Sequence, residues 1–114
     1  MSELEKQLKK GVLNIVILKM INEKDMYGYE MIQIIDEKSN GYFKLKEGSL
    51  YPVLYRLEDE GLIESYWNKE PYKRTVPRKY YKITNKGIAV LKVYAEEWND
   101  FLMGTKSILK GESF

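Results

Sequence analysis

The sequence contains no cysteine and no histidine among its 114 residues. Without cysteine a disulfide is excluded, and the chain is compatible with a reducing compartment. Without histidine it lacks the usual general base and the commonest metal ligand, which excludes a Ser–His or Cys–His nucleophile. A glycine-rich phosphate-binding loop is missing as well. We therefore expect no enzymatic activity, no metal site and no cofactor.

Long apolar runs are also missing. The longest run, VLNIVIL at residues 12–18, is followed by Lys19 and is too short to span a bilayer. The first residues, MSELEKQLKKGVL, mix acids with lysines and lack a cleavage site of small residues, so they do not resemble a secretory signal. We therefore expect no membrane partner and a cytoplasmic location.

Charge is nearly balanced overall, with a formal net charge of +2, but it is unevenly distributed. Residues 64–82 carry six basic side chains against two acidic ones, and the segments on either side carry the compensating carboxylates. Hydrophobic residues make up 44% of the chain, as in a globular protein. This polarised charge indicates that one face of the molecule meets a polyanion.

The periodicity of the apolar residues predicts a mainly α fold with a small β-hairpin. Helices are expected over about residues 3–22, 28–38 and 85–110, and another from residue 47 or 49 to a stop at Gly61. The first helix is apolar nearly all round, so we expect its own domain to cover one side and a partner the other. LIESYWN and RKYYKIT have strand character and flank the polar loop KEPYKRTVP, which predicts the hairpin.

The stretch EGSLYPVLYRLEDEGLIES, residues 47–65, predicts an unusual helix. Ser49 is a candidate N-cap, unless Glu47 already begins the helix. In either frame we expect Pro52 in the first turn, where a missing N–H costs nothing. The outward positions carry Tyr51, Tyr55 and Arg56.

Two short helices followed at once by a hairpin is the element order of a winged helix-turn-helix, whose second helix enters the DNA major groove. Gly48 and Ser49 are small enough for the helix end to approach a phosphate. The tyrosines can contact phosphates or thymine methyl groups, and Arg56 can pair with a phosphate or a guanine edge. The basic loop would reach the adjacent minor groove or backbone.

Each of these features also has a plain structural explanation, as a cap, as packing against the hairpin or as a solvated charged face. The alternative function is therefore a winged-helix protein-interaction module that binds no DNA. The combination of the features in this order favours DNA, because a structural module does not need its charge concentrated in the hairpin. We expect residues 1–84 to form a winged helix-turn-helix DNA-binding domain, whose first helix also contributes to dimerisation, and residues 85–114 to form a C-terminal dimerisation helix.

The segment YGYEMIQIIDEKSNGYFKLKEGSLYPVLYRLEDEGLIES, the tryptophan after it, PRKYYKIT and KG resemble the PadR family of bacterial winged-helix transcription regulators. The resemblance covers about residues 8–109 and points to the short subfamily with a single C-terminal helix. It implies a ligand-responsive repressor that binds double-stranded DNA as a homodimer, on a near-palindromic operator. The sequence departs from the family at Ser49, where threonine is more usual, and in the wing, which lacks the usual glycine-containing turn.

The resemblance also implies which residues contact DNA: the recognition-helix block, the tyrosine of the YGYE segment and the basic wing. The predicted DNA-binding residues are Tyr29, Lys46, Gly48, Ser49, Tyr51, Pro52, Tyr55, Arg56, Lys69, Lys73, Arg74, Arg78 and Lys79.

Trp98 lies in a heptad pattern on the last predicted helix, formed by Leu91, Ala95, Trp98, Leu102, Thr105 and Leu109. Two interpretations of Trp98 stay open. A large apolar side chain in a seam is typical of dimer packing. By resemblance to the multidrug-binding branch of the family, Trp98 would instead stack on a small planar aromatic effector, in a pore also lined by Leu8, Gly11 and Ile15.

Overall fold

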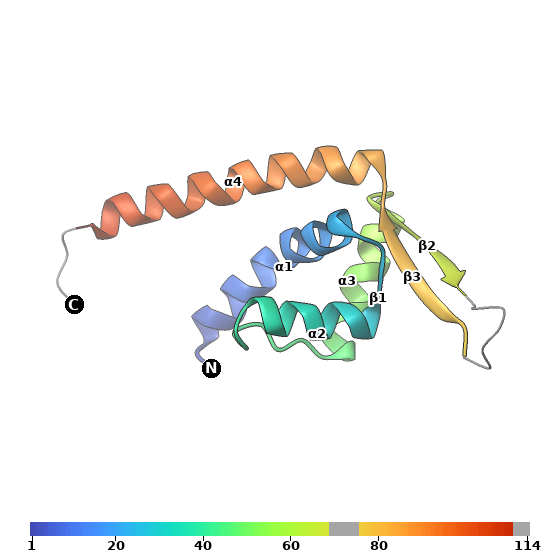
Figure 1. Ribbon diagram of the computed structural model, residues 1–114. Helices are drawn as coiled ribbons and strands as arrows, with labels where there is room; N and C mark the ends of the chain where they lie inside the picture. The colour runs from blue at the N-terminus through green and yellow to red at the C-terminus, as the bar shows by residue number, and fades with distance from the viewer. Residues whose placement is uncertain (69–75, 111–114) are drawn as a thin grey trace.

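A computed structural model describes residues 1–68 and 76–110. In these ranges the elements follow in the order α1 (Glu3–Glu23), β1 (Met26–Tyr27), α2 (Gly28–Lys38), α3 (Glu47–Asp59), β2 (Ile63–Asn68), β3 (Arg78–Ile83) and α4 (Asn85–Leu109). The three strands form one antiparallel sheet in the order β1-β3-β2 (Figure 1). The predicted fold class, mainly α with a β-hairpin and a long C-terminal helix, is confirmed.

The sheet has one strand that the sequence did not predict. The hairpin of β2 and β3 pairs Ile63 with Ile83 and Asn68 with Arg78. On the other side of β3, the short strand β1 pairs Met26 with Tyr81 and Tyr27 with Tyr80. A strand of two residues carries no periodicity, and its partners lie far away in the sequence, so no local pattern indicates it.

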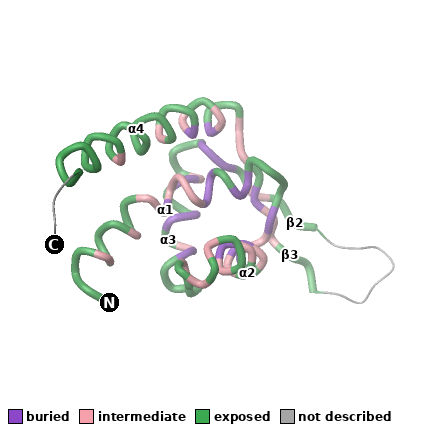
Figure 2. Tube along the Cα trace, turned by 60° about the vertical axis from the view of Figure 1, so that its left-hand side comes forward, coloured by how far each residue is buried: buried purple, intermediate pink, exposed green. Residues whose placement is uncertain are grey.

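The core lies where α1, α2 and α3 meet the sheet, and Figure 2 shows the buried segments gathered there. The inward positions of α3 form one stripe, because residues three and four apart share a helix face. Side chains of these elements form this core together with Leu62, before β2, and Leu91 of α4: Leu13, Ile17, Leu18, Met20, Ile21, Met26, Met31, Ile35, Leu50, Val53, Leu54, Leu57, Leu62, Ile63, Tyr81 and Leu91.

Residues with positive φ follow the ends of α2 and α3, and the stop of α3 at Gly61 is one that the sequence predicted. Gly41, with φ +80°, donates its N–H to the Asp36 carbonyl, and Asn40 before it also has a positive φ. Gly61, with φ +76°, follows the end of α3, and the Leu62 N–H returns to the Leu57 carbonyl. This return bond and the burial of Leu62 direct the chain straight into β2.

The start of α4 is fixed against the end of α3. The Thr84 hydroxyl accepts the Gly87 N–H at 3.0 Å and donates to the Gly61 carbonyl at 2.7 Å. Gly87 leaves no room for a side chain, because a Cβ there would collide with the Leu62 carbonyl oxygen and lie 2.7 Å from Ile83 Cγ1. From this joint α4 runs over α1 and extends beyond the rest of the domain (Figure 1).

Candidate nucleic-acid interface

The helix α3 begins at Glu47, after Lys46 in the N-cap position. The Ser49 and Leu50 amides both donate to the Lys46 carbonyl, at 3.0 and 2.9 Å, so Ser49 is the third helical residue and not the cap. Of the two frames that the sequence left open, the one that begins at Glu47 is correct. Lys46, Gly48 and Ser49 are all exposed, and a Cβ at Gly48 would have open space around it. A ligand can therefore reach the backbone of this helix end.

The predicted position of Pro52 in the first turn is wrong. Because α3 begins at Glu47, Pro52 is its sixth residue and lies in the second turn. There an ordinary residue would donate its N–H to the Gly48 carbonyl, and proline cannot. Pro52 therefore removes one intrahelical hydrogen bond. It does not occupy a first-turn position, where the backbone N–H has no intrahelical acceptor. Its side chain is exposed on the outer side of the helix.

Tyr51 is half-buried and lies against the start of α2. A Cβ at Gly28 would be 2.9 Å from Tyr51 Cζ, so only glycine permits this approach. Burial, followed by the nearby Glu47 carboxylate and Tyr55, raises the pKa of the Tyr51 phenol. Tyr29, next to Gly28 in α2, is 55% exposed. Gly28 was not among the site residues predicted from the sequence, although a glycine at a helix start between two tyrosines is a signal that could have indicated it.

Tyr55 on α3 and Lys79 on β3 bring the helix and the wing strand together. The Lys79 ammonium lies 5.9 Å from the centre of the exposed Tyr55 ring and 5.6 Å from that of buried Tyr81. Trp67 on β2 is directly opposite Lys79 in the strand register and is 68% exposed. Trp67 was not among the site residues predicted from the sequence. The alternation of side chains along the hairpin was the signal that could have paired it with Lys79.

Arg78 points to the other face of the sheet, because neighbouring residues of a strand face opposite sides. Its guanidinium lies over the Tyr27 ring at 4.6 Å, and the Tyr27 and Tyr80 rings meet edge to face at 5.4 Å. The basic residues of β3 are thus divided between two faces, and only Lys79 adjoins α3. The predicted residues Lys69, Lys73 and Arg74 lie outside the described residues.

Arg56 lies on the flank of α3 that faces α1. Its Nη2 donates to Asn14 Oδ1 at 2.7 Å. The side chain is nevertheless exposed, so its remaining N–H groups can reach a ligand.

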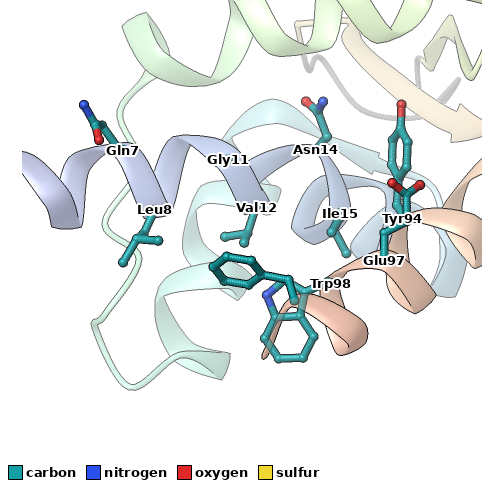
Figure 3. A pocket seen from close by; sticks show the side chains of 10 residues that line it. Gln7, Leu8, Gly11, Val12, Asn14, Ile15, Tyr94, Glu97 and Trp98 are labelled. Carbon is teal, nitrogen blue, oxygen red and sulfur yellow. The ribbon is translucent and has the colours of Figure 1, made fainter. Parts of the chain in front are cut away.

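Trp98 and the three residues predicted around it come together in a groove between α1 and α4. The groove has a volume of about 480 Å³, and Leu8, Gly11, Ile15 and Trp98 all line it. Figure 3 shows Trp98 on α4, across the groove from the side of α1 that carries Leu8, Val12 and Ile15. Trp98 remains 41% exposed, and Glu97 adds a carboxylate to the lining. An apolar wall with one acidic group suits a flat cation or the apolar face of another chain.

Among residues 1–68 and 76–110, no cluster of acidic side chains could hold a metal ion. The helices of the same ranges include none that is both long and apolar enough to cross a bilayer.

The chain is similar to known transcription regulators over most of its length. The model of the transcriptional regulator PadR-like family matches residues 17–93. A PadR-like transcriptional regulator from Bacillus cereus is 35% identical, with a TM-score of 0.79 over 93% of this chain and 99% of that one. A transcriptional regulator from Clostridium thermocellum is 34% identical, with a TM-score of 0.78 over 94% of this chain and 99% of that one. An uncharacterised protein X of Lysinibacillus sphaericus is 43% identical over 78% of this chain and 80% of its own.

Proposed function

This chain belongs to the PadR-like family of transcriptional regulators, and from that premise we propose that it is a repressor that binds a near-palindromic operator as a homodimer and is released by a small molecule. The family consists of DNA-binding transcription regulators, not enzymes. In the proposed domain organisation, residues 1–84 bind DNA and residues 85–114 hold the dimer together. A regulator of this kind acts on the chromosome, which supports a cytoplasmic location.

The proximity of Tyr55 and Lys79 carries the proposal. One is on the second helix of the helix-turn-helix and the other on the wing, yet the ammonium is 5.9 Å from the ring centre. The surface formed by Lys46, Gly48, Ser49, Tyr55 and Lys79 thus combines an open helix N-terminus, a phenol and two cations. Backbone amides, hydroxyls and lysines are the groups that contact phosphates in protein–DNA complexes.

Exposed apolar residues on α4 support the homodimer. Phe101 and Ile108 are seven residues apart beside the heptad pattern of α4, and both are more than half exposed. A single domain leaves such a row uncovered, and a second copy would bury it. The two-fold axis of the dimer would then place two α3 helices on one side of a duplex, which favours an inverted-repeat operator.

The groove between α1 and α4 supports release by a small molecule. Its lining combines an indole, apolar side chains, two carboxamides, a phenol and one carboxylate, and it opens beside the proposed dimer surface. A flat aromatic cation would gain from stacking on Trp98 and from the charge of Glu97. Binding there would favour one packing arrangement of α4 on α1. In the dimer, that arrangement would change the spacing of the two α3 helices.

Lys79→Gln should weaken DNA binding, because it removes one phosphate-directed charge from this surface. Operator duplexes would first be selected from a randomised pool with the wild-type protein, and affinity then measured by fluorescence anisotropy over a range of salt concentrations. The slope of log K against log salt should decrease in magnitude by about one for Lys79→Gln. Lys92→Gln removes an exposed lysine from α4 and is the matched control, for which the affinity and slope should stay unchanged.

A wild-type chain that is not retained by any duplex at low salt would overturn the proposal, and would favour the protein-interaction module. Equal losses of DNA affinity in Lys79→Gln and Lys92→Gln would show that the net charge of the protein, and not this surface, governs binding. Selected sequences without an inverted repeat would contradict the proposed dimeric operator.

A further inference from the structure

A hydrogen bond joins α3 to α1 at the edge of the candidate interface. Arg56 Nη2 donates to Asn14 Oδ1 at 2.7 Å, across 42 positions of sequence. Asn14 is half-buried on α1, while Arg56 is exposed on α3. Figure 3 shows the Asn14 carboxamide on the opposite side of α1 from the Val12 and Ile15 side chains, although all three residues belong to the lining of the groove. The Asn14 amide is therefore partly enclosed by the domain, whereas the Arg56 guanidinium that it contacts is open to solvent.

The chemistry of the pair leaves the cation free to act. A guanidinium has five N–H donors in a planar fork, and the bond to Asn14 uses one of its nitrogens. Asn14 is neutral, so it orients the guanidinium and leaves its positive charge in place. A carboxylate at the same position would cancel that charge. The remaining edge of the guanidinium can still meet two acceptors that lie side by side, as in a phosphate group or the O6 and N7 atoms of guanine.

We propose that Asn14 is a positioning residue for DNA binding, which holds the Arg56 guanidinium on the outer flank of α3 for a paired contact with the duplex. A free arginine side chain loses rotamer freedom when it binds, and a side chain that is already oriented loses less. This inference rests on the proposed function, because it needs DNA as the ligand. It assigns to α1 a part in DNA recognition through Asn14, which also belongs to the lining of the groove between α1 and α4.

The test is a double-mutant cycle of Asn14→Ala and Arg56→Ala on the selected operator duplex. In the wild-type background, Asn14→Ala should weaken binding by about five- to tenfold, since it releases the guanidinium. In the Arg56→Ala background the same change should have no further effect. Asn14→Ala keeps the arginine charge, so the salt slope should not change. Asn14→Asp keeps the acceptor but neutralises the cation, and it should lower the magnitude of the slope by about one.

The same variants tell the two kinds of acceptor apart. A phosphate contact predicts equal losses on operator and random-sequence duplexes, and a guanine contact predicts a loss on the operator alone. If Asn14→Ala weakened operator binding by the same factor in the wild-type and Arg56→Ala backgrounds, the inference would be overturned. An operator affinity that Asn14→Ala leaves unchanged in the wild-type background would overturn it as well. In both cases the wild-type protein still binds DNA and the proposed function stands. A wild-type protein that binds no duplex would overturn both.

Thermal melting provides the fold control. Alanine has a higher helix propensity than asparagine, so Asn14→Ala should retain a cooperative transition near that of the wild type. A large drop in melting temperature that accompanies the lost affinity, and that also appears in the Arg56→Ala background, would show a structural role and count against positioning.

Discussion

Tyr81 is the side chain that best shows how burial and ionisation are linked in this protein. It is among the largest fully buried side chains, and in the part of the chain that is described its hydroxyl has no hydrogen-bond partner. Burial raises the pKa of the phenol to about 12, with smaller contributions from Glu58, Tyr55 and Tyr51. The folded state therefore resists ionisation of Tyr81, whereas the unfolded chain loses that proton near pH 10.

Tyr81→Phe should stabilise the fold and reduce its sensitivity to alkali. At neutral pH the variant removes an unpaired buried hydroxyl, so its free energy of unfolding should rise by about 1 kcal/mol. The pKa of Tyr81 is higher in the folded protein than in the unfolded chain. The difference in proton binding between the two states therefore does not affect stability below pH 10, and it lowers the free energy of unfolding of the wild type as the pH rises toward about 12. The advantage of Tyr81→Phe over the wild type should therefore widen across that window.

Urea denaturation at neutral pH and at steps from about pH 10 to 12 measures this difference. Tyr29→Phe, at an exposed position, controls for the loss of one phenol. Parallel stability curves for the wild type and Tyr81→Phe through the alkaline range would contradict the assignment of the raised pKa to this residue.

At the scale of the elements, the joint at Thr84 decides where the groove lies. The Thr84 hydroxyl bridges the end of α3 and the start of α4, and Gly87 allows α4 to pass directly over the Leu62 carbonyl. Both contacts fix the direction in which α4 leaves the sheet. That direction brings Trp98 opposite α1, on which Leu8, Gly11 and Ile15 line the other wall.

Binding of a planar cation to this groove should quench Trp98 and not Trp67. The chain has two tryptophans, so Trp67→Phe leaves Trp98 as the only indole and Trp98→Phe leaves Trp67. Titration with proflavine should strongly quench the emission of Trp67→Phe, because the dye would stack on an indole in a groove that also carries Glu97. The emission of Trp98→Phe should change little.

Equal quenching of the two variants would remove Trp98 from the proposed effector site. It would leave dimer packing as the role of this tryptophan. Glu97→Gln provides a further comparison, since it keeps the shape of the wall but removes its charge and should weaken binding of the cationic dye.

At the scale of the whole molecule, the shape is that of a domain with a long arm. The Cα atoms span 60 × 30 × 20 Å, and Figure 1 shows the far half of α4 and the strands β2 and β3 extending from opposite ends of the domain. In the heptad pattern of α4, Leu91 is buried by the rest of the chain, whereas Trp98 and the residues after it are mostly exposed. An apolar arm of this kind is typical of a dimerisation element.

Phe101→Asp should convert the protein from a dimer to a monomer. Phe101 is 58% exposed on the apolar side of α4, so a carboxylate there would be desolvated if a partner covered it. Asn99→Asp places the same charge two residues away on the polar side of the helix and should remain dimeric. Size-exclusion chromatography with light scattering measures the mass directly.

The proposed function links dimerisation to operator binding, which allows a second measurement on the same variants. Phe101→Asp should lose affinity for the full inverted repeat but keep the weak affinity of the wild type for an isolated half-site. A wild-type protein that elutes as a monomer, or a Phe101→Asp variant that stays dimeric, would contradict dimerisation through this face.

Local patterns in the sequence were sufficient to predict the helices, the hairpin and the stops. Apolar residues three and four apart fix the inward face of a helix, and Gly61 can adopt a positive φ that other residues avoid. For the same reason the element order, and with it the resemblance to winged-helix regulators, could be read before any coordinates. The position of Pro52 was missed because it depends on where α3 begins, and the sequence offered two cap positions.

Contacts between distant segments were decided only by the tertiary structure. β1 exists because Met26 and Tyr27 meet Tyr81 and Tyr80, more than fifty residues later. The bond between Asn14 and Arg56, and the approach of Lys79 to Tyr55, likewise join elements that share no local pattern. Periodicity tells which face of a helix or strand is buried, but not which other element lies against it. That choice depends on how all the elements fill one core together.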